Sequence, residues 1–237
     1  MNRILALYIF LLLCGTVSAQ QIVEWSDLQT ITDNSRRTVY YKKGRKQPLR
    51  GKYRIIRGLD EECVKFSVGM INGDYRRYRD GVLRESGIYA KGKRNSTFTE
   101  YYQDGVTPRK ETPMQQGKID GTVKTYFRNG KIEAEKEYKQ SVESGRERRF
   151  DSKTGEQIFE SHYIDGKKDG EEWEIFEDAS TLRSRIIRHY RNGKLDGSYR
   201  VESTRDGKPY ITIEGQYTDG EKSGQWIEHN YDNNTQT

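Results

Sequence analysis

The chain has 237 residues, of which 32% are hydrophobic and 33% are charged, and its mean hydropathy is −1.04. An ordinary globular domain is roughly 45–50% apolar, so this composition excludes a thick hydrophobic core, and no segment after the first 19 residues is apolar enough to predict a membrane-spanning helix. A chain this polar can be disordered, but its 17 tyrosines and 23 regularly spaced glycines favour an ordered fold with a thin core.

Residues 1–19 have the pattern of a secretory signal peptide. Arg3 supplies a positive start, an apolar run extends from Ile4 to Cys14, and Val17-Ser18-Ala19 is a small-residue cleavage site. This predicts export to the periplasm or the cell exterior. A lipoprotein is not expected, because Leu13 stands before Cys14 where lipoprotein signals carry a small residue. An uncleaved anchor is the other alternative, but the run is shorter than the about 20 residues that span a bilayer.

Cleavage at this site would leave Cys63 as the mature chain's one cysteine, so no internal disulfide is expected. Its neighbours Val64 and Phe66 suggest a strand, in which Cys63 would serve as a small buried apolar residue. Pairing of its thiol with another chain is the alternative.

Basic residues are concentrated in the first half of the chain. Residues 20–118 hold 21 basic and 12 acidic residues, whereas residues 119–237 hold 20 and 24. The densest block contains ten basic residues and no acidic one: Arg36, Arg37, Lys42, Lys43, Arg45, Lys46, Arg50, Lys52, Arg54 and Arg57. These residues are either a solvated face or a surface for an anionic partner, such as anionic lipid, a polyanionic glycan or an acidic protein. Tyrosines interleave with the charges, which also suits nucleic acid, but the predicted export argues against a nucleic-acid partner.

A repeat begins inside this block. Its first anchor is an aromatic residue followed three positions later by glycine: Tyr41/Gly44, Phe66/Gly69, Tyr89/Gly92, Tyr163/Gly166, Tyr190/Gly193 and Tyr217/Gly220. Two degenerate copies are Met114/Gly117 and Tyr138/Ser141, and successive copies then start 25, 23, 25, 24, 25, 27 and 27 residues apart. A fixed period of this size indicates a repeat architecture.

The second anchor is a glycine followed two positions later by a large residue. Full copies are Gly51/Tyr53, Gly73/Tyr75, Gly197/Tyr199 and Gly224/Trp226, and Ser96/Phe98 replaces the glycine. Gly121 is followed by Val123, Gly145 by Glu147, and Gly170 reaches Trp173 only with one extra residue. We interpret Trp173 as the anchor of that copy.

Each period therefore holds two short extended runs separated by turns. Asn-Gly and Asp-Gly pairs suit hairpin turns because both residues tolerate positive φ. Glycines every 8–14 residues oppose long helices. The most helix-like patch, residues 133–138, occupies a strand position in its repeat and is predicted to be a strand.

The motif HYRNGKLDGSY at His189–Tyr199, with copies at His162–Trp173 and Gln216–Trp226, resembles the MORN repeat. It is more similar to the variant form found in bacterial proteins of the YwqK-type antitoxin family than to the standard MORN repeat. The resemblance covers residues 38–232 and implies an all-β fold, an elongated, twisted single antiparallel sheet of tandem hairpins with about seven or eight repeats of 23–27 residues. Residues 20–37 would be a lead-in or capping segment, and residues 233–237 a disordered tail.

No motif indicates catalysis, a cofactor or a metal site. His162 and His189 occupy the same position in successive repeats, which places them roughly 9–10 Å apart, too far for one zinc ion. The sequence contains no nucleophile elbow or P-loop. We therefore expect an exported, non-catalytic repeat scaffold that binds a protein or an envelope component. The alternatives are an antitoxin or immunity-type protein that neutralises a toxin, and binding of anionic lipid or glycan through the basic block.

Overall fold

A computed structural model describes residues 20–34, 36–177, 183–205 and 208–229. The predicted signal peptide and C-terminal tail lie outside these ranges. In the described part of the chain, every regular element is a strand except one turn of 3-10 helix, η2 (Trp25–Asp27). No helix there is long and apolar enough to cross a membrane. The chain divides into an N-terminal unit, residues 1–119, and a C-terminal unit, residues 120–237.

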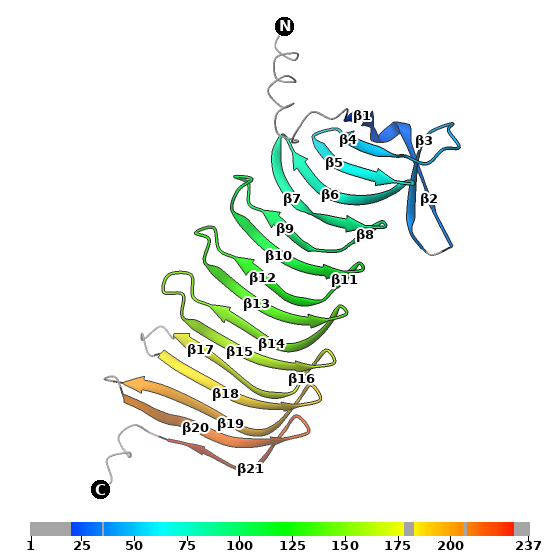
Figure 1. The fold of residues 1–237 in the computed structure, drawn as a ribbon. Helices are drawn as coiled ribbons and strands as arrows, with labels where there is room; N and C mark the ends of the chain where they lie inside the picture. The colour runs from blue at the N-terminus through cyan, green and yellow to red at the C-terminus, as the bar shows by residue number, and fades with distance from the viewer. Residues whose placement is uncertain (1–19, 35, 178–182, 206–207, 230–237) are drawn as a thin grey trace. The chain divides into compact units, whose positions relative to one another are not determined.

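The N-terminal unit is an open sheet with a small second sheet beside it (Figure 1). Consecutive strands of the large sheet pair antiparallel from β4 to β7, and β7, β9 and β10 then continue it. The strands of this unit are β1 (Gln21–Glu24), β2 (Leu28–Thr32), β3 (Thr38–Lys42), β4 (Gly51–Arg57), β5 (Asp60–Ser67), β6 (Met70–Arg79), β7 (Val82–Ala90), β8 (Lys93–Arg94), β9 (Thr97–Tyr101), β10 (Pro108–Gln115) and β11 (Lys118–Ile119).

The lead-in is more regular than the sequence suggested. Strand β1 pairs parallel with β4, an exception to the antiparallel pattern, while β2 and β3 form a separate hairpin. Val23 and Leu28 are buried in the core of the unit. Residues 20–37 therefore cover the first strand of the repeat sheet, as a capping segment does.

The C-terminal unit is a run of antiparallel hairpins, paired in sequence order. Its strands are β12 (Gly121–Tyr126), β13 (Ile132–Lys139), β14 (Val142–Phe150), β15 (Gln157–Ile164), β16 (Lys167–Lys168), β17 (Gly170–Glu177), β18 (Arg183–Arg191), β19 (Lys194–Arg205), β20 (Lys208–Thr218) and β21 (Glu221–Glu228). The helix-like patch lies in β13. The prediction of an all-β fold built from consecutive antiparallel hairpins is confirmed.

In both units, backbone hydrogen bonds join a turn to the strand that follows the turn of the preceding repeat. The amide of Gly92 donates to the Ile71 carbonyl and that of Gly193 donates to the Lys168 carbonyl, both at 2.8 Å. Asn or Asp side chains add a second contact: Asn72 Oδ1 accepts from the Lys91 amide at 3.0 Å. In the same way, Asp169 Oδ2 accepts from the Asn192 amide at 3.0 Å. The Gly and Asp of the repeated motif thus satisfy backbone groups that adjacent turns would otherwise leave exposed.

In four repeats the second glycine lies at a register shift of the strand pairing: Gly73, Gly145, Gly197 and Gly224. At Gly197, φ is +120°, and the pairing of β18 with β19 shifts register between Arg188 and Tyr190. A side chain rarely adopts that φ, and a Cβ there would also meet the His189 Cβ at 3.0 Å. This geometry explains the regular recurrence of glycine at the second anchor.

Candidate anion-binding surface

Loop 43–50, between β3 and β4, presents part of the predicted basic block around a hollow of about 1010 Å³, which we call the loop hollow. Leu49 anchors the loop: it is buried, its amide donates to the Tyr40 carbonyl at 2.9 Å, and its carbonyl accepts from the Gly69 amide at 2.7 Å. Pro48 forms an isolated antiparallel β-bridge with Tyr41. The charged residues on either side of this anchor, Arg45, Lys46 and Arg50, are exposed.

Four cationic side chains line the loop hollow: Lys42, Arg45, Lys46 and Arg50. Its other lining residues include Gln47, Pro48, Leu49 and Tyr53, and no acidic residue is among them. Lys42 Nζ donates to Gln21 Oε1 at 3.3 Å and lies 5.9 Å from the centre of the Tyr53 ring. The lining therefore carries four positive charges with no carboxylate to balance them.

The rest of the predicted basic block lies elsewhere. Arg37 pairs with Asp33 at 2.7 Å, and Arg54 pairs with Glu61. Arg36 lies in the turn between β2 and β3, and Lys43 and Lys52 are exposed outside the hollow lining. Of the ten predicted residues, the structure brings four together.

Arg57 stacks 3.9 Å from the centre of the Trp25 ring and lies near the half-buried Glu62. Burial raises the pKa of Glu62 above its usual range, although Arg57 and Arg77 oppose the shift. Arg57 thus serves the packing of the sheet, so the prediction that it binds an anion has no support in its contacts.

Two sets of predicted anchors form matching aromatic triads. In the N-terminal unit, the ring centres of Tyr75, Tyr89 and Phe98 lie 5.2–6.0 Å apart, and in the C-terminal unit those of Tyr199, Tyr217 and Trp226 lie 5.2–5.8 Å apart. Each triad has a mid-strand glycine beneath one ring. A Cβ on Gly87 would come within 2.7 Å of Phe98, and one on Gly215 within 2.4 Å of Trp226.

The interpretation of Trp173 as a repeat anchor is wrong. Glu172 occupies the buried position two residues after Gly170, with 2% of its side chain exposed. It accepts hydrogen bonds from Arg188 Nη1 at 3.2 Å and Tyr190 Oη at 3.3 Å, and it pairs with Lys168. Adjacent residues of a strand face opposite sides, so Trp173 lies on the other face.

Glu147 fills the same position one repeat earlier. Its carboxylate contacts Lys136 Nζ at 3.0 Å and accepts from Tyr163 Oη at 3.1 Å. Burial and the carboxylate raise the pKa of Tyr163 to about 12. Ionic contacts replace the aromatic packing in these two repeats. The aromatic period gives no signal for them, because Glu147 and Glu172 stand where other repeats carry an aromatic residue.

Tyr41 is also not the core residue of the first repeat. Its neighbour Tyr40 packs against the core, with its ring centre 5.1 Å from that of Phe66. Strand β3 pairs with β2, and this pairing turns Tyr40 toward the large sheet.

The glycines of the first anchor have a different role from its aromatic residues. Three of them are exposed in turns and lie outside the core: Gly44, Gly166 and Gly220. Their φ values are +72°, +79° and +95°, a conformation that favours glycine. The amides of Gly166 and Gly220 donate to the carbonyls of Glu143 and Leu195, both at 2.8 Å. Gly44 instead contributes to the lining of the loop hollow. These three glycines are therefore anchors of turn conformation and not of packing.

The other anchors lie in the strands and turns where they were predicted, and the remaining polar candidates have local partners. His162 Nδ1 lies 3.1 Å from the Glu171 carbonyl, and His189 Nδ1 lies 3.0 Å from Ser198 Oγ. Cys63 is half-buried in β5 rather than buried, and its thiol is not free. In the described ranges, no group of three or more His, Cys, Asp or Glu side chains could hold a metal ion.

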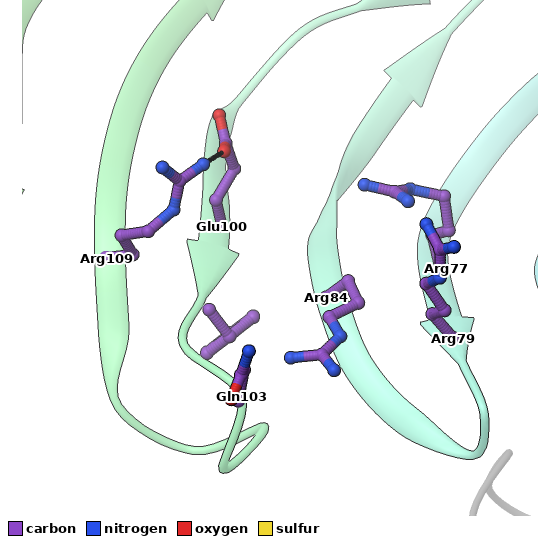
Figure 2. Close-up of a pocket in the computed structure, with 7 residues that line it drawn as sticks. Arg77, Arg79, Arg84, Glu100, Gln103 and Arg109 are labelled. Atoms are coloured by element: carbon purple, nitrogen blue, oxygen red, sulfur yellow. Dashed lines mark hydrogen bonds and ion pairs between the residues drawn. The ribbon is translucent and has the colours of Figure 1, made fainter.

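A second basic hollow, of about 420 Å³, was not predicted (Figure 2). We call it the arginine hollow, and its lining includes Arg77, Arg79, Arg84 and Arg109. The segment RRYRDGVLR at residues 76–84 was a signal for it. The highest density of basic residues lies elsewhere, at residues 36–57. The arginine hollow has no comparable local signal, because its arginines come from separate hairpins.

No protein-family model and no curated protein matches this chain.

Proposed function

We propose that the protein is an exported, non-catalytic repeat scaffold of the MORN type, and that it holds an acidic segment of a protein partner in the loop hollow. The observation that carries this proposal is the charge of the lining, with four cations and no carboxylate. Such a site attracts anions and repels cationic segments. Neutralisation of a toxin would be one instance of this kind of binding.

The shape and the apolar part of the lining favour a peptide over a membrane or a glycan. A bilayer presents a broad surface, whereas the loop hollow is concave and includes Pro48, Leu49 and Tyr53 beside its cations. Apolar surface beside a few placed polar groups is the usual composition of a binding site. An acidic peptide can supply carboxylates and apolar side chains together.

The test compares a triple variant, Arg45→Ala with Lys46→Ala and Arg50→Ala, with a matched control. The control removes the exposed cations Lys65, Lys93 and Arg146, which lie outside this hollow, so both proteins lose three charges. The probe is a fluorescent Glu-rich peptide that includes Leu and Tyr, titrated in low and moderate salt. We expect the triple variant to bind about tenfold more weakly or worse, and the control to bind as the parent does.

Equal losses in the two variants would show general charge attraction and would contradict the proposal. Heparin and vesicles containing phosphatidylglycerol serve as competing probes. If either binds more tightly than the peptide, and loses that binding in the triple variant, the occupant is a glycan or a membrane and the proposed protein partner is wrong.

A further inference from the structure

The arginine hollow lies at the opposite end of the strands from the loop hollow. Gly51 begins β4 beside the loop hollow, and Arg57 at the far end of β4 aligns with Asp60, which in turn aligns with Arg79. Arg79 and Arg77 come from β6, Arg84 comes from β7, and Arg109 comes from β10 (Figure 2). The two hollows are therefore separate sites of the N-terminal unit.

Two of the four arginines are balanced by carboxylates. Arg109 pairs with Glu100, which also lines the hollow. Arg77 lies 3.9 Å from Asp60 and 3.7 Å from the buried Glu85. These contacts hold the side chains at the walls and offset much of their charge.

The other two arginines make no ion pair with any residue in the described ranges. Arg84 Nη1 donates to the Tyr102 carbonyl at 3.1 Å, a bond that positions the guanidinium without neutralising it. No carboxylate of the described residues lies within ion-pair distance of Arg79. Figure 2 shows Arg84 directed toward the side chain of Gln103, which also lines the hollow.

This arrangement matches a compact anion with several acceptor oxygens. The guanidinium group presents N–H donors in a planar fork that binds phosphate oxygens in pairs, and the Gln103 amide adds another possible donor. Because Arg77 and Arg109 are paired with carboxylates, Arg79 and Arg84 leave two unbalanced positive charges at the hollow, which match the charge of a dianion. A volume of about 420 Å³ accommodates a phosphate group with a small organic body.

We propose that the arginine hollow is a binding site for a phosphomonoester group, in which Arg79 and Arg84 bind the phosphate oxygens and Arg77 and Arg109 form the charged walls. This site is independent of the acidic-peptide site proposed for the loop hollow. The phosphomonoester can belong to a small soluble molecule or to a lipid headgroup, because the chemistry of recognition is the same.

Calorimetric titration of the full chain with inorganic phosphate tests the proposal. We expect saturable binding of one phosphate per chain, about tenfold weaker binding by Arg84→Gln, and no measurable binding by the double variant Arg79→Gln with Arg84→Gln. Arg76→Gln is the matched control: Arg76 is exposed in the same strand but does not line the hollow, so its variant should bind as the parent does.

A second arm distinguishes the sources of the phosphate. Vesicles containing phosphatidic acid are compared with phosphatidylcholine vesicles, and binding that exceeds free phosphate and disappears in the double variant identifies a lipid headgroup. The triple variant of the loop hollow should keep its phosphate affinity, so failure of one site leaves the other distinguishable. The proposal is overturned if neither phosphate probe binds saturably, or if the double variant and Arg76→Gln bind both probes equally well.

Discussion

The same cross-strand row of the repeat has different chemistry in strands β4–β6 of the N-terminal unit and in strands β13–β18 of the C-terminal unit. In the N-terminal unit, Tyr53 faces Val64, which faces Tyr75, and all three are buried. In the C-terminal unit, Lys136 faces Glu147, and Glu172 faces Arg188. The backbone frame is the same, so the repeat accepts either aromatic packing or ionic contacts in its interior. The N-terminal row should respond to changes in shape, and the C-terminal row to changes in charge.

The largest effect is expected from Glu172→Gln. The substitution leaves Lys168 and Arg188 without their buried carboxylate, and breaking a buried ion pair in this way costs about 3 kcal/mol. Urea denaturation would measure the loss, and hydrogen exchange with mass spectrometry would locate it in the C-terminal unit. The control is Glu171→Gln, on the opposite face with 49% of its side chain exposed, and it should change stability little. Equal losses in the two variants would show that the ionic row does not stabilise this unit.

A smaller effect is expected from Gly87→Ala in the N-terminal unit. The new Cβ would overlap the rigid, buried ring of Phe98 at 2.7 Å, and such overpacking costs about 2 kcal/mol. In a Phe98→Ala background, the same Gly87→Ala substitution should cost far less, because the clashing ring is gone. A double-mutant cycle measures this coupling. An additive cycle would mean that the glycine is not required by the ring.

The smallest effect is a difference in acid response between the two units. Burial favours a higher pKa for Glu147, but the hydrogen bond and charge of Lys136 outweigh it and lower the pKa below its usual value of 4.5. The stability that Glu147 contributes is therefore present above pH 4.5 and is lost as the pH falls through the lower folded-state pKa. Burial raises the pKa of Glu62 in the N-terminal unit, so protonation there favours the folded state as the pH falls.

Hydrogen exchange from about pH 6 down to about pH 3 should therefore show protection falling first in the C-terminal unit. The values are compared after correction for the intrinsic pH dependence of exchange. Glu147→Gln removes the titrating carboxylate and should flatten the acid response of that unit. If both units lose protection together in the parent protein, the ionic row is not what sets the acid response.

Most of the hairpin frame could be predicted from local sequence, whereas the loop hollow and the arginine hollow could not be predicted in full. Turn glycines such as Gly92 and Gly193 recur at a fixed period because each turn needs the same backbone conformation and the same hydrogen bond. The loop hollow was partly predictable, because its four cations belong to one short segment, residues 42–50. The arginine hollow was indicated only in part, because three of its arginines belong to residues 76–84 while Arg109 belongs to another hairpin and joins them only when the strands pair.

The sequence by itself determined the all-β class, the period and the turns, because these depend on residues close together in the chain. Tertiary structure decided which side of each strand faces inward. It placed Glu172 inside and Trp173 outside, and it chose Tyr40 over Tyr41, since strand pairing and register set the facing of neighbouring residues. It also decided which charges are neutralised: Arg54 pairs with Glu61, whereas Arg79 and Arg84 line the arginine hollow without an ion pair to any described residue. Ion pairs depend on distances across strands, which no local pattern encodes.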